Sequence, residues 1–164
     1  MKRRNLIGVI AIAAVAVLAW LVVPLGGEPA VASLPETATL DDYGTYITGP
    51  APLNLRLMAL EKLRKKSDSG VVAQLDAIAK GDDKRIAIYA TTALGKVKTT
   101  AAKAKLKALL ESTSVDMNVR IGALSALAQH WRSSSDRSYL EDRCEGSSRL
   151  AARLAWIEEH VYED

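Results

Sequence analysis

A nine-residue pattern that occurs four times limits how this chain can fold more than any other feature. The starts lie 31, 33 and 29 residues apart, and the copies begin at Leu55, Ile86, Val119 and Ser148. The fifth residue is alanine in every copy, namely Ala59, Ala90, Ala123 and Ala152. The ninth is large and apolar: Leu63, Leu94, Leu127 and Trp156. A period in this range is the sequence signature of stacked helical units, in which small residues allow close helix contact.

A second helix is predicted after each of the first three copies. Apolar residues at helical spacing predict helices over 71–79 and 102–110, and Thr99 and Thr100 lead into the second. The third is short and begins at Asp136 or Ser138, with Leu140 and Cys144 as its apolar edge. The fourth copy has only its first helix, which is predicted to cap the stack.

Asp83 and Asp116 stand three residues before the second and third copies, where a carboxylate caps a helix. With Val119-Arg120, Ala123 and Ala126-Leu127, the third copy resembles the HEAT-repeat family of armadillo-like α-solenoids, in its short bacterial form. This resemblance extends over 53–164. It implies an all-α, right-handed α-α solenoid of about three and a half repeats, with a shallow groove along the second helices. It also implies binding to proteins rather than a reaction.

The chain departs from the family pattern in three places. Pro52 and Glu145 stand where the leading Asp is expected in the outer copies, and Ala87 replaces the arginine found second in the others.

The N-terminal segment has the properties of a membrane-spanning helix. Leu6 to Leu25 is a run of twenty uncharged residues behind Lys2, Arg3 and Arg4. At about 1.5 Å per residue it reaches roughly 30 Å, the thickness of a bilayer core. The basic residues precede the run and acidic ones follow it, so the positive-inside rule keeps the N-terminus in the cytoplasm. We therefore predict a single-pass protein of the cytoplasmic membrane, with 1–25 as a signal anchor and the repeats outside the cytoplasm.

A removed signal peptide is the alternative interpretation. Ala30-Val31-Ala32 before Ser33 fits a small-x-small cleavage site, and cutting at Ala32–Ser33 would release a periplasmic or secreted protein. Residues 26–52 contain proline and glycine at intervals typical of a tether. Within them, Leu40, Tyr43 and Ile47 after Thr39 predict a short helix at 40–48.

Charge is unevenly distributed along the chain. The full sequence has 22 Lys and Arg against 19 Asp and Glu. Eight basic and two acidic residues lie between Lys80 and Lys107, whereas six basic and ten acidic residues follow Lys107. The candidate partner-binding surface comprises four lysines of the basic stretch and a tryptophan at a helix end: Lys96, Lys98, Lys103, Lys107 and Trp131. Its lysines serve an acidic partner segment, anionic lipid headgroups near the anchor or, as on most helices, solubility alone.

No catalytic motif was recognised, and neither a metal nor another cofactor is predicted. His130 and His160 end corresponding helices, but two imidazoles without a third ligand rarely hold a metal. Nucleic acid is not expected as a partner, because no aromatic residues interleave the lysines. The sequence thus favours a membrane-tethered scaffold or adaptor for an unidentified protein. An accessory single-pass subunit of a larger membrane complex is the second interpretation, and an enzyme the third.

Overall fold

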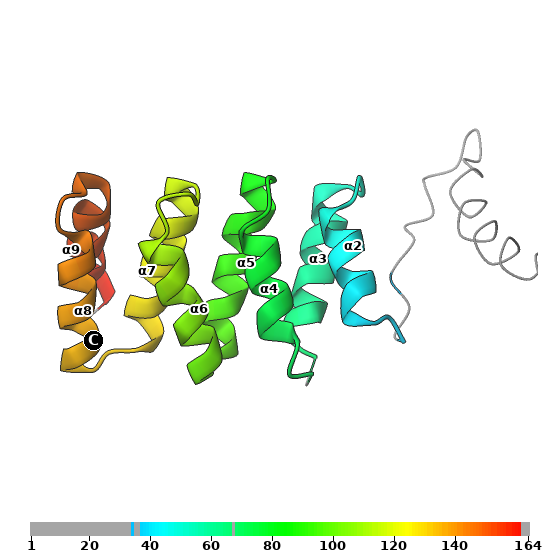
Figure 1. The fold of residues 1–164 in the computed structure, drawn as a ribbon, viewed down its shortest axis with the longest axis horizontal. Coiled ribbons are helices and arrows are strands. Elements are labelled where there is room, and N and C mark those ends of the chain that lie inside the picture. The colour runs from blue at the N-terminus through cyan, green and yellow to red at the C-terminus, as the bar shows by residue number, and fades with distance from the viewer. Residues whose placement is uncertain (1–33, 35–36, 67, 162–164) are drawn as a thin grey trace, which may run out of the picture. The chain divides into compact units, whose positions relative to one another are not determined.

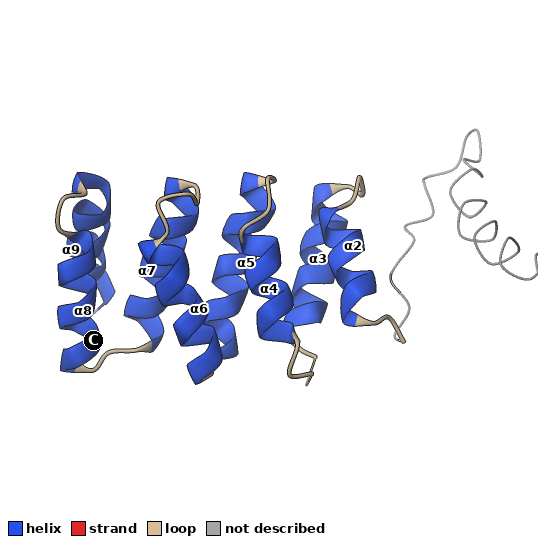
Figure 2. Ribbon diagram, in the orientation of Figure 1, coloured by secondary structure: helices blue, strands red, loops and turns tan. Residues whose placement is uncertain are grey.

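A computed structural model describes residues 34, 37–66 and 68–161, and this part of the chain contains helices and loops but no strand (Figure 2). The eight helices are α2 (Leu40–Thr48), α3 (Leu53–Arg64), α4 (Val71–Ala79), α5 (Lys84–Val97), α6 (Thr100–Glu111), α7 (Met117–His130), α8 (Ser134–Cys144) and α9 (Ser148–Val161). The all-α class is therefore confirmed. The signal anchor at 1–25 and the cleavage site at Ala32–Ser33 lie outside the described residues.

The helices pack in pairs along the chain. The pairs are α2 with α3, α4 with α5, α6 with α7 and α8 with α9, and Figure 1 shows them side by side in chain order. The odd-numbered helices also form a continuous layer, because α3 contacts α5, α5 contacts α7 and α7 contacts α9. Counted this way there are four complete pairs, so α9 is not the unpaired half-repeat that the sequence predicted.

The helix α2 belongs to this packed assembly. The compact unit begins at Leu34, and Tyr43 and Ile47 are buried in its core. Thr39 caps α2 by accepting from the Asp42 backbone N–H at 3.2 Å, while Asp42 accepts from the Thr39 N–H at 2.8 Å. The short helix at 40–48 is therefore confirmed, but the boundary predicted at residue 53 is moved toward the N-terminus.

Side-chain caps fix three of the other helix starts where the sequence places them. Asp83 accepts from the backbone N–H groups of α5, Asp116 does so at α7, and Thr99 caps α6. The start predicted for α8 is wrong. Ser133 caps this helix and Asp136 lies one turn inside it, so the helix is longer than expected.

Small residues line the layer of odd-numbered helices, and three of the four constant alanines are buried in it. Ala59, Ala90 and Ala123 are all buried, and a Cβ atom at Gly95 of α5 would lie only 2.7 Å from the Ala126 Cβ of α7. Small side chains at these positions allow the layer of odd-numbered helices to close. The expected contact between α5 and α7 is thus made by glycine as well as alanine.

The fourth copy is displaced by two residues from its predicted alignment. Counted from the first residue of each helix, Leu150 and Leu154 in α9 correspond to Val119 and Ala123 in α7, and both leucines are buried. Ala152 is exposed, and Trp156 is 45% exposed rather than part of the core. The fourth unit therefore begins 31 residues after the third, not 29.

The arginine found second in the pattern ties two of the pairs together, α2 with α3 and α6 with α7. Arg56 Nε donates to the Ile47 carbonyl at the end of α2, and Arg120 Nε donates to the Leu110 carbonyl at the end of α6, at 2.9 Å. Each arginine thus satisfies a carbonyl that the end of the preceding helix leaves without an intrahelical partner. In α9, Arg149 lies two residues before the position that corresponds to Arg120. Its guanidinium donates to the Asn118 side-chain oxygen at 3.2 Å.

No described helix combines the length and the apolar character that crossing a bilayer requires.

Candidate functional site

The lysines expected to line a groove are held within the molecule. Lys103 of α6 forms an ion pair with Asp136 of α8, whose side chain is only 12% exposed. Lys107 lies 3.9 Å from the centroid of the Tyr139 ring, also on α8. These two lysines attach α8 to α6, so solubility alone does not account for them.

Electrostatics at Asp136 follow from this pairing. Burial by itself raises the pKa of the carboxyl, but donors from Lys103 and Ser133 outweigh it, so the pKa lies below its usual value. The carboxylate is charged at neutral pH, and Lys103 is the cation that faces it.

A second lysine contact joins α6 to α4. Lys105 Nζ lies 3.0 Å from Asp76 Oδ2, and Lys80 Nζ lies 2.8 Å from the same oxygen. Asp76 is buried, and its other oxygen, Oδ1, has no hydrogen-bond partner within the described structure. This carboxylate therefore serves as a bridge between helices.

An aromatic network completes the surface between α6 and α8. The Tyr139 hydroxyl donates to Glu111 Oε1 at 2.9 Å, and Arg143 Nε donates to the same oxygen at 3.0 Å. Burial, followed by the neighbouring Glu111 carboxylate, raises the pKa of Tyr139 to about 12. The phenol is thus a donor at neutral pH and holds two helices together.

The other predicted residues are divided between two places. Trp131 is partly buried against the core, in an edge-to-face contact with the His130 ring at 6.0 Å. Lys98 ends α5 in the left-handed conformation, with φ of 56°. Lys96 lies apart from Lys103 and Lys107, on the outer surface of the odd-numbered helices. Of the predicted residues, the structure brings Lys103 and Trp131 together, with Nζ 6.0 Å from the centroid of the indole ring, whereas Lys96 lines a different hollow.

The outer surface of α3, α5, α7 and α9, here called the odd-helix face, has the stronger features. Among the described residues, the most exposed large hydrophobic side chains all lie on it: Met58, Tyr89 and Trp156, at 59%, 50% and 45%. Met58 and Tyr89 are the sixth residues of their helices. Exposed apolar and aromatic side chains gathered on one face mark interaction sites more often than scattered ones do.

A hollow of about 430 Å³ opens in this face between α5 and α7. The sixth residue of α7 is Gly122, where α3 and α5 have Met58 and Tyr89 and α9 has Arg153. The missing side chain leaves space above two partly buried isoleucines. Its lining is Ile88, Thr92, Lys96, Asn118, Ile121, Gly122, Ser125, Ala126, Gln129, His130 and Arg153. We call it the odd-helix hollow.

The charged groups of the odd-helix hollow are cationic. Lys96 and Arg153 line it, and no carboxylate does. Arg153 Nε donates to Ser125 Oγ at 3.0 Å, and its guanidinium carbon lies 4.5 Å from the centroid of the Trp156 ring. Burial, with Lys98 and Arg132 nearby, lowers the pKa of His130, so this imidazole is neutral at pH 7.

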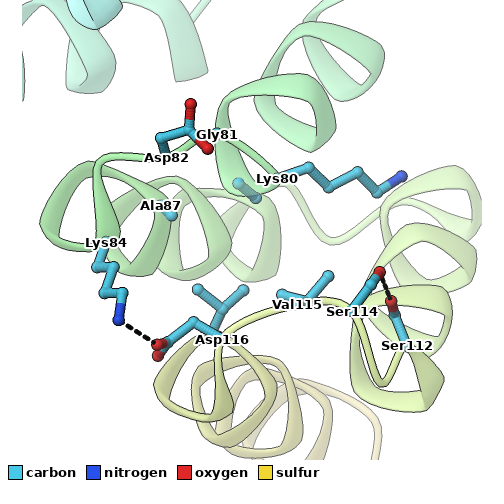
Figure 3. A pocket seen from close by; sticks show the side chains of 11 residues that line it. Lys80, Gly81, Asp82, Lys84, Ala87, Ser112, Ser114, Val115 and Asp116 are labelled. Atoms are coloured by element: carbon cyan, nitrogen blue, oxygen red, sulfur yellow. Dashed lines mark hydrogen bonds and ion pairs between the residues drawn. The ribbon is translucent and has the colours of Figure 1, made fainter.

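Another hollow, of about 320 Å³, lies at the edge where α5 and α7 begin (Figure 3). Lys84 reaches Asp116 at 3.2 Å, and Ser112 and Ser114 bond each other at 2.9 Å. The two aspartates that cap these helices, Asp83 and Asp116, already occupy the exposed N–H groups. This hollow is therefore less suited to an anion than its position suggests.

The described residues contain no group of three His, Cys, Asp or Glu side chains that could hold a metal. Cys144 is buried on α8, and burial, with Glu158 nearby, raises the pKa of its thiol.

No protein-family model and no curated protein matches the chain. The case for a binding face therefore depends on the geometry described above. The sequence contains one signal for the odd-helix hollow: at the position of the repeat where the first two copies have Met58 and Tyr89, the third copy has Gly122.

Proposed function

We propose that this chain is a membrane-tethered, extracytoplasmic binding module, built as a HEAT-like α-solenoid, that holds a protein partner on its odd-helix face. The observation that carries the proposal is the coincidence of Met58, Tyr89 and Trp156 with a hollow on one layer of helices. Aromatic and methionine side chains are enriched at protein interfaces. Paired helices in a row support a rigid display of that face.

The tethered location is inferred from the run Leu6–Leu25 and the basic residues before it. A tether of 26–33 and the loop before α2 would keep the module close to the membrane. The second candidate, an accessory subunit of a membrane complex, is favoured by the small residues Gly8 and Ala11–Ala19 in that run. Replacing Leu6–Leu25 with an unrelated apolar helix separates the two, because only a packed subunit requires its own sequence there.

The binding face is tested by affinity capture from membranes. The full chain is compared with Tyr89→Ser and Trp156→Ser, which change exposed side chains and should leave the melting temperature almost unchanged. We expect both variants to lose most of the protein captured by the wild type. The matched control is Lys107→Gln on the opposite layer, which should retain it. Equal capture by all four proteins would reject the odd-helix face as the binding site.

A further inference from the structure

We propose that the odd-helix hollow takes an acidic segment of the protein partner, with an apolar side chain over Ile88 and Ile121 and carboxylates at Lys96 and Arg153. This inference rests on the function proposed above and specifies the chemistry of the partner. It places the acid-binding site on α5, α7 and α9, and not on the lysines of α6.

The first argument is charge complementarity. The lysines of α6 at positions 103 and 105 meet carboxylates of the chain itself, Lys103 at Asp136 and Lys105 at Asp76. Within the described residues neither Lys96 nor Arg153 lies in an ion pair. The carboxylate of Glu61, whose pKa Arg64 and then Lys96 help to lower, is already paired with Arg64. The hollow therefore has positive charge that the described chain does not neutralise, and a partner with carboxylates would.

The second argument is that Arg153 is held in place before any partner arrives. Its Nε is bound to Ser125, while its guanidinium lies against the Trp156 ring. The ring in turn stacks on His160, with centroids 4.7 Å apart. Fixing an arginine side chain in advance reduces the conformational entropy that binding would otherwise remove. Its planar fork of donors matches a carboxylate.

The third argument is the apolar floor. Ile88 and Ile121 are partly buried and line the hollow beside Gly122. A volume of about 430 Å³ is at the low end of the range for binding pockets, which begins at about 300 Å³. It suits one or two side chains of an extended segment. A flat, anionic membrane surface would meet the cations but leave this concave floor unused.

The experiment is a methyl NMR titration of the full chain in nanodiscs of zwitterionic lipid, with isoleucine methyl groups labelled. Ile88 and Ile121 report on the hollow, and the buried Ile47 and Ile78 are internal controls. The probe is a synthetic hexapeptide with two leucines flanked by glutamates. Its counterparts have glutamines in place of the glutamates, or serines in place of the leucines. We expect saturable shifts at Ile88 and Ile121 with the glutamate–leucine peptide, and much weaker ones with both counterparts.

Charge variants complete the test. Arg153→Gln and Lys96→Gln should each raise the dissociation constant of the glutamate–leucine peptide about tenfold, the usual effect of one charge-assisted contact. Lys62→Gln, an exposed lysine of α3, is the matched control and should bind like the wild type. Equal affinity for glutamate and glutamine peptides, or no shift at millimolar peptide, would overturn the proposal. So would shifts at Ile88 and Ile121 caused by anionic nanodiscs alone, which would assign the hollow to lipid.

The two proposals fail in different ways. If the peptides do not distinguish charge but Tyr89→Ser still abolishes capture, the odd-helix face binds a partner of other chemistry and only this inference is rejected. If capture also survives in Tyr89→Ser and Trp156→Ser, the proposed function of this face is rejected as well.

Discussion

Two glycines on neighbouring helices face different surroundings. A Cβ atom at Gly95 would lie 2.7 Å from the Ala126 Cβ, which is closer than carbon atoms pack. At Gly122 the nearest atom would be Thr91 Cγ2 at 3.5 Å, an ordinary van der Waals contact. The first glycine is required by packing, and the second leaves a space that is open to a ligand.

These distances predict opposite effects of one substitution. Gly122→Ala should stabilise the protein by about 0.5–1 kcal/mol, because alanine is the better helix former and has room. In Gly95→Ala the same gain is exceeded by overpacking, which costs about 1–3 kcal/mol, so stability should fall. Urea unfolding of both variants measures the difference. A gain in both would show that α5 and α7 can separate without loss.

The pair of Lys103 and Asp136 makes a pH-dependent contribution. Lys103→Met leaves a nearly buried carboxylate without its cation and should cost about 1–3 kcal/mol at pH 7. Because the folded pKa of Asp136 is lowered below about 3.9, the pair stabilises the protein above that pH, and the contribution is lost as pH falls through the folded pKa.

Urea unfolding at pH 7 and pH 3 measures this contribution. We expect the difference between wild type and Lys103→Met to shrink at the lower pH. Lys62→Met changes an exposed lysine of α3. This variant should have the free energy of unfolding of the wild type at both pH values. A loss in Lys103→Met that is the same at pH 3 as at pH 7 would mean that the lysine acts through packing alone.

At the scale of elements, local signals located most helices. Asp83, Asp116 and Thr99 are cap residues followed by apolar periodicity, so both the sequence and the structure begin helices there. Such signals fail where two residues can perform the same task. Ser133 and Asp136 are both good caps, and in the structure Ser133 caps the helix while Asp136 pairs with Lys103 of α6.

The alignment of α9 failed for a related reason. Alanines at 151, 152 and 155 supply small residues at several spacings, so the sequence alone does not say which of them faces α7. In the structure both Ala152 and Trp156 face outward and Leu154 takes the inner position. Burial of two leucines outweighs the match of alanine with alanine.

The tie between α2 and α3 predicts a further effect. Arg56 is mostly buried, donates to the Ile47 carbonyl and lies 2.8 Å from Asp83 Oδ2. Arg56→Ala should therefore destabilise the protein by about 1.5–3 kcal/mol, the usual value for hydrogen bonds to charged groups. Arg85→Ala, at an exposed position of α5, is the control and should change stability by less than about 0.5 kcal/mol. Thermal unfolding compares them, and equal melting temperatures would contradict the role assigned to Arg56.

At the scale of the whole molecule, the candidate site was harder to predict than the fold. A stretch of lysines is visible in the sequence, but its neutralisation by Asp76 and Asp136 depends on helices distant in the chain. The odd-helix hollow likewise needs α5, α7 and α9 together. Periodicity says which side of a helix is buried, whereas it does not say which exposed side has a hollow.

Stability should vary along the row of pairs. The helices α5 and α7 have odd-numbered neighbours on both sides, whereas α8 buries only Leu140 and Cys144 as apolar residues. Hydrogen exchange measured by mass spectrometry should therefore be slowest in α5 and α7 and fastest in α8. Equal protection of α7 and α8 would show that the pairs open only together.

The order of packing has a consequence for how the protein is made. Each described helix packs mainly on the next one or two along the chain, so few contacts between helices require residues that are distant in the sequence. Chains with local contacts fold fast, and their early segments can settle while later ones are still being synthesised. A ribosome making this chain could thus release α2 and α3 as a packed pair before α8 is synthesised. Synthesis and folding would then proceed in the same direction.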